Sequence, residues 1–141
     1  MSSLRDQFEG REFDWFAIDS AGNLGHFSSA GFGPVPTCIL ERFAEADSLP
    51  EEILRLPVIG EATSHLSGNV TEWMEVARRG LYSFDWKHST GPYHRAATPR
   101  AVIHVSALPP QMIAAHSIAK FPGVRFSELV QFWPERECGC V

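Results

Sequence analysis

Residues 13–27, FDWFAIDSAGNLGHF, predict a β-hairpin near the start of the chain. Residues 11–19 carry apolar side chains at both parities, which is typical of a strand covered on two sides. The following Ser20-Ala21-Gly22-Asn23 has the composition of a turn, because glycine and asparagine tolerate left-handed backbone angles. Residues 24–28 return as a second strand, so the pattern indicates two antiparallel strands joined by a tight connection.

Three polar side chains in this hairpin are candidates for chemistry. Asp14 and Asp19 are five residues apart, so they point to opposite faces of the first strand and are not expected to form a catalytic pair. We expect Asp19 to begin the turn. His26 lies near the Gly/Pro-rich loop that follows, and it is the residue of the hairpin best placed to line a site.

The rest of the chain predicts an α+β fold. The chain has 141 residues, of which 44% are hydrophobic and 21% charged, as expected of one globular domain. We expect residues 1–134 to form this domain and residues 135–141 to form a flexible tail. The further elements that the patterns predict are helices at 37–46, 48–57, 70–79 and 111–120, and strands at 81–86, 101–106 and 124–132. Directly joined strands and grouped helices favour a single, largely antiparallel sheet of about five strands with helices packed on one side.

Targeting signals are not apparent. No apolar run approaches the roughly 18 residues of a membrane-spanning helix, so we expect no membrane partner. The first residues, MSSLRDQFEGRE, are charged and lack the apolar stretch of a secretory signal. Cys38 stands alone in sequence, and Cys138 and Cys140 lie at the end, which is no disulfide framework. We therefore expect a cytoplasmic protein.

Charge is unevenly distributed along the chain, whose formal net charge is -5. Residues 41–61 contain six acidic residues against Arg42 and Arg55, whereas residues 78–100 contain five basic residues against Asp85. The acidic whole argues against nucleic-acid binding, which depends on many phosphate contacts. The two segments either contact each other, remain solvated, or recognise a charged partner.

Standard catalytic motifs are absent from the sequence. There is no P-loop, no dinucleotide-binding glycine pattern, no nucleophile elbow and no paired-histidine metal motif, so we assign no catalytic residue, metal or cofactor. Cys138-Gly139-Cys140 lacks a second pair of ligands. The nearest grouping is Asp85, His88, Tyr93 and His94, which either assemble a metal or acid/base site or are solvated loop residues.

Alternating aromatic residues form the other candidate surface. Tyr82, Phe84 and Trp86 share one face of a predicted strand, where they either pack into the core or stack on a ligand. A half-exposed ring beside Arg95 would also anchor a protein partner. The candidate binding residues are His26, Tyr82, Trp86, His88, Tyr93, His94 and Arg95.

Several short segments resemble a group of small, mostly uncharacterised bacterial proteins. They are Asp14-Trp15-Phe16-x-x-Asp19-x-x-Gly22-x-x-Gly25-His26-Phe27, then Gly80-Leu81-Tyr82-Ser83-Phe84-Asp85-Trp86, and the Leu108-Pro109 step. In being compact, acidic and aromatic-rich, the chain is also similar to small immunity-type proteins, which work by binding a toxin. The resemblance implies a bacterial protein that neutralises a toxin.

Two hypotheses on function remain open at this point. The first is a non-enzymatic protein-binding module of a bacterial cytosol, whose partner is another protein and whose surface draws on residues 41–61 or 82–100. The alternative is a small enzyme, or a protein that binds a small ligand or metal, using the His/Asp/Tyr loop cluster. The sequence gives no oligomeric state.

Overall fold

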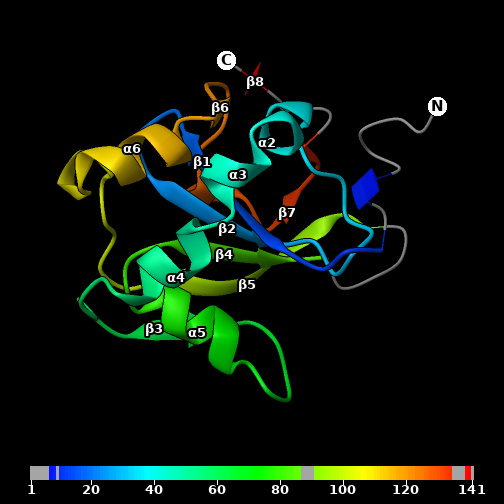
Figure 1. The fold of residues 1–141 in the computed structure, drawn as a ribbon. Coiled ribbons are helices and arrows are strands. Elements are labelled where there is room, and N and C mark those ends of the chain that lie inside the picture. The colour runs from blue at the N-terminus through cyan, green and yellow to red at the C-terminus, as the bar shows by residue number, and fades with distance from the viewer. Residues whose placement is uncertain (1–6, 9, 87–90, 135–138, 141) are drawn as a thin grey trace.

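The computed structural model describes residues 7–8, 10–86, 91–134 and 139–140, which form one open, mixed sheet with helices around it (Figure 1). The described strands follow the order β3-β5-β4-β2-β1-β6-β8, and β7 pairs with β5. Their bounds are β1 Asp14–Asp19, β2 Leu24–Ser28, β3 Ala62–Ser64, β4 Tyr82–Asp85, β5 Tyr93–Pro99, β6 Ala119–Phe121, β7 Gln131–Phe132 and β8 Gly139–Cys140. Among the described strands, only the pairs β1–β6 and β2–β4 are parallel, which confirms an α+β fold with a largely antiparallel sheet. The described strands number eight, above the predicted five, because β3, β6, β7 and β8 have only two or three residues each.

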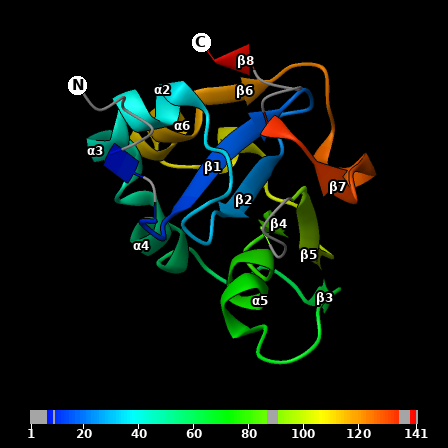
Figure 2. The same ribbon diagram turned by 90° about the vertical axis from the view of Figure 1, so that its right-hand side faces the viewer.

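The helices are short and lie on both sides of the hairpin strands, whereas the sequence predicted them on one side only. They are α2 Thr37–Glu41, α3 Phe43–Ala46, α4 Leu49–Leu54, α5 Thr71–Ala77 and α6 Pro110–His116, with single 3-10 turns at Val105–Ala107 and Phe126–Glu128. Apolar side chains of α4, α5 and α6 pack with Phe16, Ile18 and Leu24 on one face of the sheet. Those of α2 and α3 join the core on the other face. Figure 2 shows α2, α3 and α4 along one edge of the molecule and β7 along the opposite edge.

The predicted hairpin is confirmed. Antiparallel pairing runs from Asp14 opposite Ser28 to Ile18 opposite Leu24. Asp19 begins the turn as expected, and its Oδ1 accepts the backbone N–H groups of Ala21 and Asn23, each at 2.9 Å. Its Oδ2 accepts the N–H of Phe126 at 2.9 Å, so one buried carboxylate joins the hairpin to the C-terminal part of the chain.

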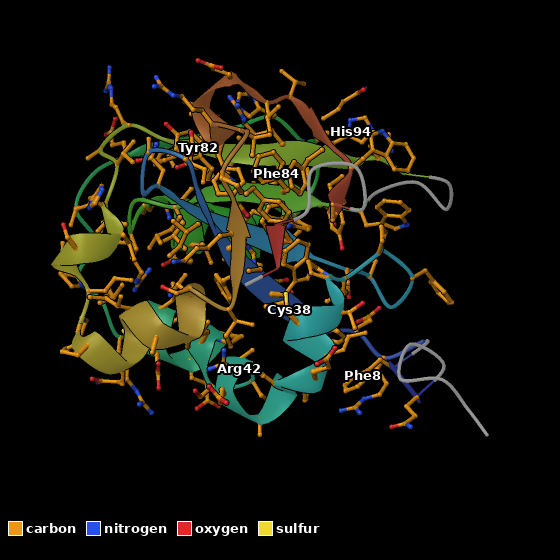
Figure 3. The ribbon with its side chains drawn as sticks, turned by 90° about the horizontal axis from the view of Figure 1, so that it is seen from above. Phe8, Cys38, Arg42, Tyr82, Phe84 and His94 are labelled. Carbon is orange, nitrogen blue, oxygen red and sulfur yellow. The ribbon has the colours of Figure 1, made fainter. Side chains whose placement is uncertain are left out.

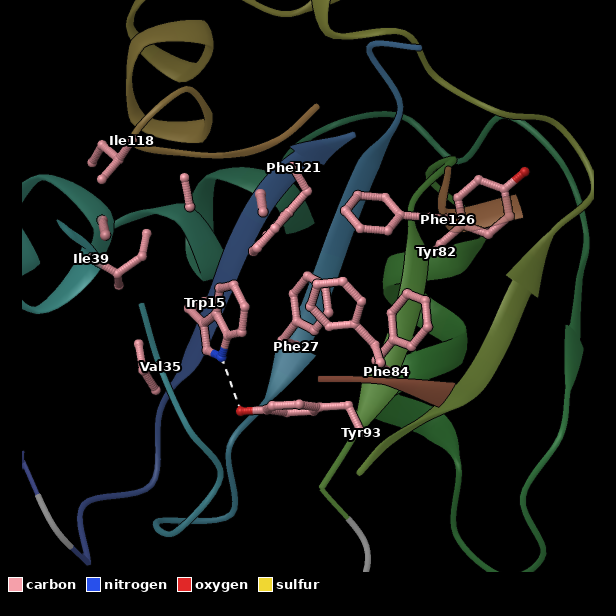
Figure 4. Close-up of a cluster of buried hydrophobic side chains, with 14 of the residues drawn as sticks. Trp15, Phe27, Val35, Ile39, Tyr82, Phe84, Tyr93, Ile118, Phe121 and Phe126 are labelled. Carbon is pink, nitrogen blue, oxygen red and sulfur yellow. Dashed lines mark hydrogen bonds between the residues drawn. The ribbon is translucent and has the colours of Figure 1, made fainter. Parts of the chain in front are cut away.

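Aromatic rings fill the core on the face occupied by Trp15 (Figure 4). The Trp15 and Phe27 rings stack with centroids 4.1 Å apart. Trp15 Nε1 donates to the Tyr93 hydroxyl at 3.1 Å, and that hydroxyl donates to the Pro34 carbonyl at 3.1 Å. Tyr82, Phe84 and Trp86 are buried here as well, which confirms the interpretation of these alternating rings as core.

The prediction of a strand at 101–106 was wrong. The strand that pairs with β4 is β5, which lies in the segment that we expected to be a polar loop. Residues 101–106 do show alternating burial, but the N–H groups of Ile103 and Val105 donate to the carbonyls of Gly80 and Gly22, which belong to turns. The alternation of apolar and polar residues therefore indicated a half-buried segment, but this segment has no partner strand.

Two C-terminal elements also differ from the prediction. The helix predicted at 111–120 ends at His116, and the buried Ala119 and Phe121 belong to strand β6. In place of a strand over 124–132 there is a 3-10 turn followed by the two-residue β7. Of the expected tail, residues 135–138 and 141 lie outside the described residues, and Gly139 and Cys140 form β8 against β6.

Cys38 does not stand alone, because it is disulfide-bonded. The other cysteines of the chain are Cys138 and Cys140, whose side chains lie outside the described residues. The sequence did not predict this disulfide, because about a hundred residues separate Cys38 from either of the other two cysteines. Among the described residues, no helix has the length and apolar character needed to cross a membrane.

Candidate functional site

A polar cluster lies on the face of the sheet that α4 and α5 cover. It consists of Asp14 from β1, His26 from β2 and Glu72 from α5, with one potential ligand atom of each within 4.8 Å of the others. The hairpin register brings the first two together, because Phe16 is opposite His26 and Asp14 is two residues from Phe16 on the same face. The first turn of α5 places Glu72 over them.

The imidazole of His26 is fully buried, and both of its nitrogens have partners. Nε2 lies 2.7 Å from Asp14 Oδ2, and Nδ1 lies 2.6 Å from Ser83 Oγ. An ionised carboxylate only accepts, so in the neutral ring Nε2–H donates to Asp14 and the Ser83 hydroxyl donates to Nδ1. Parallel pairing of β2 with β4 places His26 directly beside Ser83.

This Ser–His–Asp chain is not the machinery of a serine hydrolase. A nucleophilic serine has to reach its substrate, whereas Ser83 is completely buried under the helices. Its hydroxyl instead fixes the ring orientation of His26 and leaves the Nε2 side of the ring facing Asp14 and Glu72. The reactive edge of the cluster is therefore the edge formed by imidazole Nε2 and two carboxylates.

The two carboxyl groups of the cluster have pKa values displaced in opposite directions. Burial acts to raise the pKa of Asp14, but the charge of His26 and hydrogen bonds from His26, Glu72 and Ser28 outweigh it and hold this pKa below its usual value. Burial raises the pKa of Glu72, and the neighbouring Asp14 charge raises it further. Repulsion between two nearby carboxylates makes the site attractive to a cation.

Two hollows meet at this cluster, and Asp14 and Glu72 line both. One has a volume of about 180 Å³, with His26 and Glu75 in its lining and apolar walls made by Phe16, Pro50, Leu54 and Val76. The other has a volume of about 280 Å³ and is lined mostly by polar residues, among them Ser28 and Asp85. A water molecule or a small ligand can therefore reach the carboxylates from either side.

The structure brings together only part of the loop grouping predicted from the sequence: among its described residues, Asp85 and His94 are neighbours across two strands, whereas Tyr93 lies on the opposite face. Tyr93 points into the aromatic core, whereas Asp85 lies on the opposite face of the sheet, beside Glu72. His94 pairs with Asp85 across β4 and β5, and Figure 3 shows it well apart from Tyr82, with Phe84 between them in that view. His88 lies outside the described residues.

The remaining predicted residues contribute to packing. The guanidinium of Arg95 lies 5.5 Å from the centre of the Tyr82 ring and donates to the carbonyl of Phe126. Trp86 is buried, and its Nε1 has no hydrogen-bond partner among the described residues. Of the predicted candidates that the structure describes, only His26 belongs to the polar cluster.

The acidic segment forms a second feature of the surface. Along α2, α3 and α4, the side chains of Glu41, Glu45, Asp47 and Glu51 are exposed. Arg42 pairs with Glu45 at 2.6 Å, and Glu61 at the end of the segment pairs with Arg100 at 3.2 Å. Exposed apolar side chains follow in the same segment of the chain, with Leu54 50%, Val58 54% and Ile59 42% exposed.

Comparison with protein-family models, with curated proteins and with solved structures finds no match to this chain. The assignment of the site therefore depends on its geometry. Sequence reasoning considered Asp14 only as a partner of Asp19 and did not select Glu72 or Ser83. The hairpin register contained a usable signal for Asp14, since an aspartate and a histidine two positions out of register share a face. No sequence signal places Glu72 above them.

Proposed function

We propose that this chain is a protein-binding module whose partner presents a basic surface, in keeping with its resemblance to immunity-type proteins that neutralise toxins. The observation that carries the proposal is the run of exposed acidic side chains along α2–α4, followed in the chain by the exposed apolar Leu54, Val58 and Ile59. Protein interfaces commonly combine an apolar centre with a charged rim, and opposite charge on the partner accelerates association.

Internal contacts of the basic residues favour the acidic segment over residues 82–100 as the binding surface. Arg100, at the end of residues 82–100, pairs with Glu61 at 3.2 Å. Arg95 is held between Tyr82 and Phe126. Glu41, Asp47 and Glu51 have no ion pair among the described residues, which leaves their charge available to a partner.

The test compares two variants that differ only in location. Glu41→Lys reverses charge at the exposed end of α2, where a cation suits the helix dipole, so the fold should be retained. Glu128→Lys makes the same change at the end of the 3-10 turn near β7, on the other edge of the molecule. Each variant and the wild type are used as bait in lysate of the native host, and the affinity for each captured protein is then measured with purified components.

The expected result is a partner with a basic surface that binds the wild type and Glu128→Lys equally. Glu41→Lys should weaken this binding about tenfold, and added salt should weaken it further. Binding that is insensitive to Glu41→Lys and to salt, or a host that yields no such partner, would contradict the proposal.

A further inference from the structure

We propose that Asp14, His26 and Glu72 bind a divalent transition-metal ion, with zinc as the best-fitting ion. The proposal is independent of the acidic surface over α2–α4. It rests on three side chains from three different elements whose potential ligand atoms gather within 4.8 Å, one of them a fully buried imidazole.

The distances suit a metal after a small adjustment. Zinc ligands lie about 2.0–2.2 Å from the ion, so tetrahedral neighbours stand roughly 3.4 Å apart. His26 Nε2 and Asp14 Oδ2, now 2.7 Å apart, have to separate by about 0.7 Å to reach that spacing. Glu72 is exposed at its surface edge, so its side chain is free to move inward onto the ion.

The second nitrogen of His26 already has the partner that a ligand histidine requires. Metal-bound histidines typically donate their other N–H to a fixed acceptor, which sets the ring orientation. When the ion takes Nε2, the ring binds as its other neutral tautomer: the proton on Nε2 passes to solvent, Nδ1 takes up a proton from solvent, and Nδ1–H donates to Ser83 Oγ. Because a hydroxyl both donates and accepts, the hydrogen bond at 2.6 Å persists with its direction reversed.

Donor chemistry narrows the choice of ion. One imidazole and two carboxylates suit zinc and its neighbours, whereas magnesium and calcium prefer sites made of oxygen ligands. Three protein ligands leave a coordination position that opens into the adjoining hollows, where a water molecule fits.

The experiment uses the full chain, stripped of metal by chelation and then titrated with Zn²⁺ alone. Calorimetry gives the stoichiometry and affinity, and Co²⁺ in place of Zn²⁺ reports coordination by its visible absorption. Glu72→Gln removes one ligand at the surface edge and should leave the fold intact. Glu75→Gln is the matched control, because it makes the same change one turn along α5 in the lining of the same hollow.

The expected result is one ion per chain, with affinity lowered about tenfold or more by Glu72→Gln and by Asp14→Asn but unchanged by Glu75→Gln. Excess Mg²⁺ or Ca²⁺ should not displace the ion. Thiolates also bind zinc, so a chain with Cys138→Ser and Cys140→Ser serves as a control for binding by the cysteines. This variant should bind the ion as well as the wild type does. Equal binding by Glu72→Gln and Glu75→Gln, loss of binding on serine replacement, or no binding at millimolar Zn²⁺ would overturn the proposal. Circular dichroism of each metal-free variant separates loss of ligand from loss of fold.

Discussion

His116 should make the stability of this protein fall as the solution is acidified from neutral pH. Its side chain is completely buried at the end of α6. Nδ1 lies 3.0 Å from the Met112 carbonyl and donates to it, whereas Nε2 has no hydrogen-bond partner among the described residues. The rings of Phe16 and His116 pack in a T-shaped arrangement, with their centroids 5.3 Å apart. Protonation would place an N–H donor in this apolar environment without an acceptor.

Burial lowers the pKa of His116 to about 4, from 6.5 in the unfolded chain. The unfolded state therefore binds a proton below pH 6.5, while the folded state does not until about pH 4. The contribution to stability is complete above pH 6.5 and is lost as the pH falls toward 4. One pKa unit corresponds to about 1.4 kcal/mol, so the loss amounts to about 3 kcal/mol across this window.

The assay is urea unfolding at intervals from pH 7 to pH 4, on the wild type and on His116→Leu in the presence of a chelator. Titration of other groups is common to both proteins, so the difference between the two curves isolates His116. Leucine has neither proton affinity nor an unsatisfied nitrogen, and it should increase stability at pH 5 while flattening the pH dependence. Parallel curves for the two proteins, or a variant less stable than the wild type at pH 5, would refute the reasoning.

Two further predictions concern the hairpin turn and the cysteines. Asp19→Ala should lower the free energy of unfolding by about 3 kcal/mol or more in urea titrations, because three backbone N–H groups lose their acceptor. Asp19→Asn keeps one acceptor oxygen, so its free energy of unfolding should fall by less. Alkylation of the unreduced, denatured chain followed by mass spectrometry should label one thiol of the three cysteines, because Cys38 is disulfide-bonded, whereas three labelled thiols would contradict the structure.

Local patterns predicted the hairpin and the helices well because their determinants are close in sequence. The β1–β2 turn needs only Asp19, Gly22 and the alternation on either side, and α5 needs only its own first and last turns. β5 was missed because its partners are non-local. Its residues Tyr93–Pro99 read as polar loop, and they become a strand through pairing with β4, β3 and β7.

The candidate site was harder to predict for the same reason. His26 could be selected, since it lies on a predictable strand next to a glycine-rich loop. Its partners come from positions 12, 46 and 57 residues away in sequence, at Asp14, Glu72 and Ser83. The alternation of side chains within the hairpin can predict only that Asp14 lies on the same face as His26. The position of α5 over the sheet and the parallel pairing of β4 bring in the other two, and both depend on the whole fold.

Two buried histidines in the same molecule differ in what surrounds them. Both pack against Phe16, at 5.2 Å for His26 and 5.3 Å for His116, and both are fully buried. The pKa of His116 is governed by burial and a single backbone carbonyl, so an apolar residue should replace it with a gain in stability. His26 has both nitrogens satisfied and two carboxylates at one edge, an arrangement that apolar residues could pack more stably. This polar chain, on the face of the sheet opposite the aromatic core, is therefore better suited to the cation site that we propose than to stabilising the core.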